Sequence, residues 1–179
     1  GGMGQAIGCS TQVSDWVFPV VPPSYDEAHP LLVSFDVLGA DTQAVGLLLG
    51  KDLVPAGKLD QLGALASTCL VYFHANGCDA GHCTDDMMTF RDGMLAGDAV
   101  VLAPEYPGYG VLSEYETSVA AITLMAESAW HFCVHGLGFR PAQVMLVGRS
   151  IGTGPAAELA YSVASRARAA ATRPEPEGL

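Results

Sequence analysis

Basic side chains are scarce in this sequence: eight of 179 residues are lysine or arginine, against nineteen aspartates and glutamates. The formal net charge of −11 disfavours nucleic acids and anionic membrane surfaces as electrostatic partners. The five cysteines lack paired Cys-x-x-Cys spacing, which argues against a disulfide framework and against a zinc ribbon. Free thiols in a reducing compartment fit better, so we expect a cytoplasmic protein.

A secretory signal and a membrane-spanning segment are missing as well. The chain does not open with the charged and then apolar residues of a signal peptide. The apolar stretch 117–138 is interrupted by Glu127, His131 and His135, and its apolar residues recur at helical spacing. This stretch therefore predicts a buried helix.

The opening residues, GGMGQAIGCS, carry a weak membrane signal. With Met3 as the initiator, Gly4 would be a candidate for myristoylation and Cys9 for palmitoylation, and the protein would lie peripherally at a membrane. The alternative is a loose, glycine-rich terminus.

Composition divides the chain into three parts. Residues 1–30 form a proline-rich lead-in that should run extended over the surface, with Trp16 and Phe18 pinning it to the body. Residues 31–166 hold a sizeable apolar core and are expected to form a partial domain. Residues 167–179 are expected to be a frayed or disordered tail.

Apolar runs in the central part predict five strands and three helices. The strands are expected at residues 31–37, 44–49, 68–73, 99–103 and 143–147, the first two pairing as a hairpin, and the helices at 85–96, 114–135 and 151–164. The alternation of strand and helix predicts an α/β fold with a mostly parallel sheet and helical crossovers. In such a sheet, reactive groups gather at the carboxyl ends of the strands.

The most informative motif follows the last predicted strand. Gly148, Ser150 and Gly152 have the Gly-x-Ser-x-Gly spacing of a nucleophile elbow, a tight turn that holds a serine hydroxyl outward. The backbone N–H of Ile151 would then be one oxyanion donor, and that of Asn76, after the strand at 68–73, the second. The simpler interpretation is a tight turn with Ser150 as a helix cap.

A dinucleotide-binding turn is an alternative interpretation of the same glycines, together with Gly154. It requires an acidic residue about twenty positions further on, at the end of another strand. The sequence has Arg173-Pro-Glu there and no strand before it, so this alternative is weaker.

Three segments together resemble the α/β-hydrolase fold: FHANG, PEYPGYG and VGRSIGTGPAAELA. They are most similar to the serine hydrolases of the α/β-hydrolase-domain-17 kind, which remove palmitoyl groups from proteins. The similarity covers roughly residues 31–163, and the PVVPPSY lead-in is also alike. It implies Ser150 as nucleophile, Ile151 and Asn76 as oxyanion donors, a structural role for His74, and an acyl ester or thioester, or an acylated protein, as substrate.

The sequence departs from that family in two ways. Ala75 stands where the family commonly has glycine, and its Cβ is expected to disturb the amide of Asn76. The fold orders its triad as Ser, acid and then His, but no histidine follows Ser150. We therefore expect a domain that is incomplete at its C-terminal side, with little or no hydrolysis from these residues alone. A non-catalytic remnant or binding module is the rival hypothesis.

Other candidates favour structure over chemistry. Cys78, His82 and Cys83 lack a fourth ligand at suitable spacing, so no metal site is predicted, and no cofactor is implied. Asp79, Asp85 and Asp86 are interpreted as charges at a helix start. Tyr106 and Tyr109, the aromatic residues of the PEYPGYG segment, are expected to line a pocket.

Overall fold

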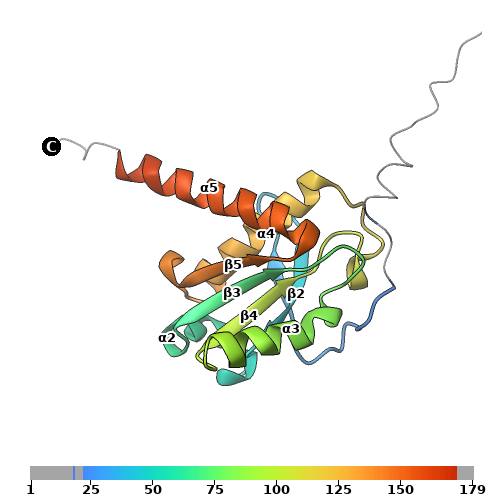
Figure 1. The fold of residues 1–179 in the computed structure, drawn as a ribbon, viewed down its shortest axis with the longest axis horizontal. Coiled ribbons are helices and arrows are strands. Elements are labelled where there is room, and N and C mark those ends of the chain that lie inside the picture. Colours follow the sequence, from blue (N-terminus) through green and yellow to red (C-terminus); the bar gives the residue numbers. More distant parts are fainter. Residues whose placement is uncertain (1–17, 19–21, 173–179) are drawn as a thin grey trace, which may run out of the picture.

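Five strands form one sheet in the order β1-β2-β4-β3-β5 in the computed structural model, which describes residue 18 and residues 22–172 (Figure 1). The strands are β1 (Leu32–Asp36), β2 (Gln43–Leu49), β3 (Thr68–Phe73), β4 (Ala99–Pro104) and β5 (Val144–Gly148). The α-helices are α2 (Leu62–Leu65), α3 (Thr84–Met88), α4 (Val119–His131) and α5 (Thr153–Ala171). Short 3-10 helices are η1 (Lys51–Leu53), η2 (Leu59–Gln61), η3 (Gly81–Cys83), η5 (Gly110–Leu112), η7 (Pro141–Gln143) and η8 (Ser150–Gly152); η4 (Thr89–Met94) and η6 (Phe132–Gly136) are π-helical.

Strand directions agree with the predicted architecture. β3 pairs in parallel with β4 and β5, while β2 is antiparallel to both β1 and β4. Four of the five strands therefore run the same way. The mostly parallel sheet, the α/β class and the β1–β2 hairpin predicted from the sequence are all confirmed. Within the described residues, β5 pairs on one side only.

Two helices differ from their predicted bounds. The helix expected at 114–135 begins at Val119, because the Ser118 side chain accepts the N–H of Ala121 at 3.1 Å and caps it. The helix expected at 85–96 is a succession of η3, α3 and η4, and it ends where Ala96 and Gly97 adopt left-handed φ angles of 52° and 76°.

Helix α5 was expected to end near residue 164, with a tail from 167. It instead continues to Ala171, because an alanine-rich stretch with the highest helix propensity follows Val163. Its C-terminal half projects past the sheet in Figure 1.

Helices cover both faces of the sheet, as Figure 1 shows, with α4 and α5 on one side and α3 on the other. Alternate residues of β3 divide between the layers: Cys69, Val71 and Phe73 pack toward α4, and Leu70 and Tyr72 toward α3. The sheet thus forms the middle of three layers, and the loops at the carboxyl ends of β3, β4 and β5 meet at one edge.

The lead-in is described only in part. Phe18 packs against the core layer of α4, as predicted, whereas Trp16 and the acylation candidates Met3, Gly4 and Cys9 lie outside the described residues. Among the residues described, no helix is both long and apolar enough to cross a membrane.

Candidate active site

Ser150 stands at the bend between β5 and the helices that follow it. Its φ angle is +53°, in the left-handed region, and the residue is exposed to solvent. A non-glycine residue pays about 1–2 kcal/mol for this conformation. Ser150 and Ala96 are the two non-glycine residues with positive φ in the described chain.

The bend at residues 148–152, called here the β5 turn, is packed too closely for side chains at its glycines. A Cβ on Gly152 would overlap the carbonyl of Phe73, and a Cβ on Gly148 would overlap the carbonyl of Gly152. Arg149 N–H donates to the Phe73 carbonyl at 3.0 Å, which joins this turn to the end of β3. The glycine spacing therefore reflects close backbone contact.

The helix-cap interpretation of Ser150 does not match the geometry. The N-cap positions of η8 and α5 are Arg149 and Gly152, and neither helix start has a side-chain cap hydrogen bond. Arg149 reaches away toward α3, where its guanidinium contacts Asp86 at 2.8 Å. The turn thus holds Ser150 in a strained backbone conformation without using its side chain as a cap.

The loop after β3, residues 74–77, is called here the β3 turn. Asn76 is exposed, and its Oδ1 accepts the Tyr109 hydroxyl at 2.8 Å. Ala75 has no positive φ, so the absence of glycine there imposes no backbone strain. Because the β5 turn is bonded to Phe73, directly before His74, both predicted oxyanion residues, Ile151 and Asn76, belong to adjoining turns.

A buried carboxylate lies beneath the β3 turn. Glu105 is fully buried and accepts hydrogen bonds from the Tyr25 hydroxyl at 2.7 Å, from Ala80 N–H at 3.0 Å and from Tyr106 N–H at 3.2 Å. His74 Nε2 lies 3.2 Å from Glu105 Oε1, but the pair lacks hydrogen-bond alignment, and this nitrogen has no other hydrogen-bond partner. We treat it as a close polar contact, not a hydrogen bond.

A second buried carboxylate, Asp79, lies between the β3 turn and η3. Asp79 accepts the Ser24 N–H and hydroxyl, each at 2.5 Å, and contacts the ring Nδ1 of His82 at 2.7 Å. Burial opposes ionisation of Asp79, but the hydrogen bonds from Ser24 and His82 outweigh it, and its pKa is lowered. The sequence predicted a helix-start charge here. Asp79 does accept the His82 N–H at the start of η3, and it also binds the lead-in.

Tyr106 and Tyr109 lie in the loop that follows β4, called here the β4 loop. Both are buried, as expected for residues that serve packing. Tyr106 stacks on His74 with ring centroids 3.8 Å apart, and its hydroxyl donates to the His74 carbonyl at 2.9 Å. Burial, and then the nearby Glu105, raise the pKa of Tyr109 to about 12. Burial also raises the pKa of Tyr106, so both phenols stay protonated near neutral pH and act as hydrogen-bond donors.

An apolar cavity of about 270 Å³ opens beside the β5 turn. The cavity is lined by Ile151 and Gly154 next to the turn, by Phe18 of the lead-in and Tyr106, and by Ile122 of α4. The cavity is lined mainly by carbon, so it suits a small aliphatic group.

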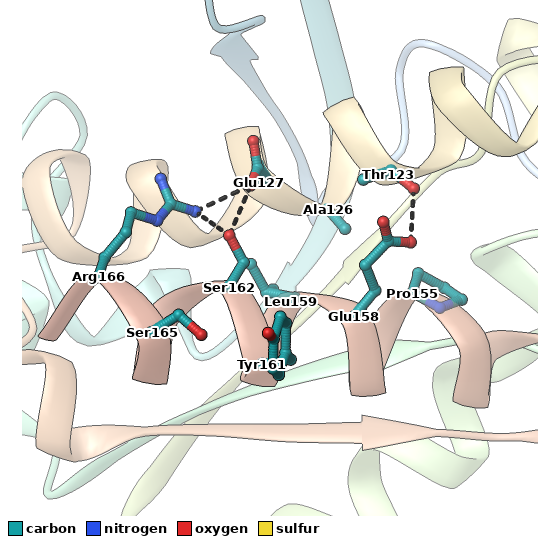
Figure 2. A pocket seen from close by; sticks show the side chains of 10 residues that line it. All are labelled: Thr123, Ala126, Glu127, Pro155, Glu158, Leu159, Tyr161, Ser162, Ser165 and Arg166. Atoms are coloured by element: carbon teal, nitrogen blue, oxygen red, sulfur yellow. Dashed lines mark hydrogen bonds and ion pairs between the residues drawn. The ribbon is translucent and has the colours of Figure 1, made fainter. Parts of the chain in front are cut away.

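A larger cavity of about 500 Å³ lies between α4 and α5 (Figure 2). Its side chains are tied to one another: Glu127 binds Arg166 at 2.8 Å and Ser162 at 3.1 Å, and Glu158 accepts the Thr123 hydroxyl at 3.0 Å. Its lining does not include Ile151, the residue next to Ser150, which does line the smaller cavity, so we place the candidate chemistry at the smaller cavity.

The metal candidates are not gathered into a site. The described residues contain no group of three or more side chains placed to hold a metal ion. Cys83 is buried with its Sγ on the Asp79 carbonyl at 3.4 Å, and burial raises its pKa to about 12. This thiol is therefore protonated near neutral pH.

The sequence indicated the residues of the two turns but not that Asp79 and Glu105 are buried near them. Tyr25, Asp79 and Glu105 are far apart in the chain, and no spacing signal joins them. The one available signal was local: an acidic residue inside the apolar PEYPGYG loop is unusual enough to suggest a buried partner.

No protein-family model matches the sequence, and no curated protein is detectably similar to it. Among solved structures, a bacterial heroin esterase is 17% identical, with a TM-score of 0.54 over 76% of this chain and 39% of its own. An ester hydrolase from the metagenome of Lake Arreo is 14% identical, with a TM-score of 0.51 over 87% of this chain and 45% of its own. The chain spans less than half the length of either protein, and it has part of an α/β-hydrolase fold.

Proposed function

We propose that the chain carries the nucleophile and the oxyanion donors of an ester or thioester hydrolase. The observation that carries the proposal is the left-handed φ of Ser150, at an exposed turn between a parallel strand and a helix. A serine hydroxyl presented in this way is the arrangement that acyl transfer needs. The esterases that share the fold, and the apolar cavity beside Ile151, support it.

In the proposed reaction, Ser150 Oγ attacks the acyl carbon while a base removes its proton. The carbonyl oxygen gains negative charge, which the N–H groups of Ile151 and Asn76 would stabilise, and the alcohol or thiol then leaves with a proton. Water hydrolyses the acyl-serine by the same steps. No histidine follows Ser150, so the histidine of the fold's usual order of Ser, acid and His is not among these residues.

The sequence resemblance suggests a finer version of this proposal, in which the substrate is a palmitoylated protein at a membrane face. It rests on the quoted motifs alone.

The test is labelling by a fluorophosphonate, located by peptide mass spectrometry, with and without added imidazole as a substitute base. We expect slow labelling of Ser150 that imidazole accelerates and that Ser150→Ala abolishes. Ser113→Ala is the matched control, because Ser113 is an exposed serine in the β4 loop with an ordinary φ of −60°. Silence at Ser150 under both conditions would favour the non-catalytic binding module, and tight binding of a nicotinamide dinucleotide would favour the dinucleotide-binding alternative.

A further inference from the structure

One buried side chain connects three distant segments of the chain. Glu105, directly after β4, accepts from Tyr25 in the lead-in, from Ala80 after β3 and from its own neighbour Tyr106. Tyr25 and Glu105 are separated by 80 residues, and both are buried. A carboxylate this deeply buried is costly unless its oxygens are satisfied, so its three donors are held firmly.

The same side chain lies at the base of the β3 turn. Glu105 Oε1 is 3.2 Å from the ring of His74, and Tyr106, which binds Glu105 through its N–H, stacks on that ring. Tyr106 also holds the His74 carbonyl, and Tyr109 holds Asn76 Oδ1. The turn is therefore linked to Glu105 through Tyr106, whose carbonyl also accepts the Tyr109 N–H at 3.0 Å.

We propose that Tyr25 and Glu105 are positioning residues for the oxyanion turn. The lead-in completes the site from outside the sheet, because the Tyr25 hydroxyl fixes the Glu105 carboxylate, which holds Tyr106 through its N–H. Tyr106 in turn holds the His74 ring and carbonyl, and so the backbone direction toward Asn76. This inference rests on the proposed function only for the role of Asn76 in catalysis. The positioning itself concerns the geometry of the turn.

The space around Glu105 leaves little room for other arrangements. A Cβ on Gly110 would overlap Glu105 Oε2, so the loop packs directly on this oxygen. A glutamine at 105 would turn an amide NH₂ toward a donor in either orientation, because each oxygen already faces an N–H or O–H group. The site thus requires a carboxylate and not merely a polar side chain.

The experiment compares two tyrosines in ¹⁵N-labelled protein. Tyr25→Phe removes the 2.7 Å bond to Glu105, and Tyr72→Phe removes an equal 2.7 Å bond from a β3 tyrosine to Asp86. We expect both to lower the melting temperature, but only Tyr25→Phe to shift or broaden the Asn76 amide peak. Imidazole-assisted labelling of Ser150 should also slow about tenfold in Tyr25→Phe, less than the hundred- to thousand-fold cost of losing an oxyanion donor outright.

An Asn76 peak that stays unchanged in Tyr25→Phe would overturn the inference, since a merely structural role would lower stability without moving it. If Tyr25→Phe does not fold, Ser24→Ala is used in its place. This substitution removes one of the two hydrogen bonds between Ser24, the residue before Tyr25, and Asp79, and it should shift the Asn76 peak less. An unmoved peak there would again contradict us. A shifted Asn76 peak without any labelling of Ser150 would support the inference and contradict the proposed function.

Discussion

The β5 turn and the β3 turn lie side by side at one edge of the sheet, yet they are held in different ways. The β5 turn is fixed by backbone contact: its glycines touch the carbonyls of Phe73 and of the turn itself. The β3 turn is fixed by side chains, because Tyr106 holds the His74 carbonyl and binds the buried carboxylate of Glu105, while Asp79 holds the segment that follows the turn. The first should respond to added volume, and the second to changes in charge.

Added volume should have the largest effect. Gly152→Ala places a methyl group against the Phe73 and His74 carbonyls, which cannot move without breaking the Arg149 bond to Phe73. We expect a loss of about 2–3 kcal/mol in the free energy of unfolding, measured with denaturant. Gly154→Ala is the matched control, since nothing lies within 4 Å of its added Cβ. Equal losses in the two variants would mean that close packing does not hold the turn.

Relief of backbone strain should give a smaller change of opposite sign. Ser150→Gly removes the cost of a left-handed φ of 53°, and we expect it to stabilise the protein by about 1 kcal/mol while abolishing fluorophosphonate labelling. Thermal and denaturant unfolding would measure the gain. If Ser150→Gly instead destabilises the protein, the serine side chain contributes more to stability than its backbone strain costs.

The sequence predicted the fold closely because its signals are local. Uninterrupted apolar runs such as TCLVYF define strands buried on both faces, and the β3 prediction matches its bounds. The β5 turn was equally predictable. Its glycines are required by two backbone contacts, of Gly148 with the carbonyl of Gly152 and of Gly152 with the carbonyl of Phe73 in β3. Helix bounds were less predictable, because α4 starts at the side-chain cap of Ser118 and the helical segment after β3 ends at the left-handed Ala96, and composition specifies neither.

The polar network could not be predicted in the same way. Tyr25 meets Glu105 across 80 residues and Ser24 meets Asp79 across 55, so their pairing depends on the folded sheet and not on spacing. Acidic residues are also rarely fully buried, and apart from the apolar neighbours of Glu105 in PEYPGYG the sequence gives no reason to place these two in the interior.

A change in pH should have the smallest effect, through Asp79 in the segment that follows the β3 turn. The pKa of Asp79 is lowered on folding, so its contribution to stability is present above about 3.9, the usual pKa of an unfolded aspartate, and is lost as the pH falls through the folded value. We expect Asp79→Asn to lower stability at neutral pH and to weaken its decline below about pH 4. Urea unfolding between pH 2 and pH 7 measures this. Parallel curves for the two proteins would contradict the assigned role of Asp79.

The two turns should converge on one reacting oxygen. The most direct measurement is the ¹H–¹⁵N spectrum of the chain after a fluorophosphonate has reacted at Ser150, which places a phosphoryl oxygen where the oxyanion would form. We predict that the amide protons of Ile151 and Asn76 both move downfield, as expected for N–H groups that donate to a negatively polarised oxygen. If the Ile151 amide moves and that of Asn76 stays in place, the turns do not share a site and the account is wrong.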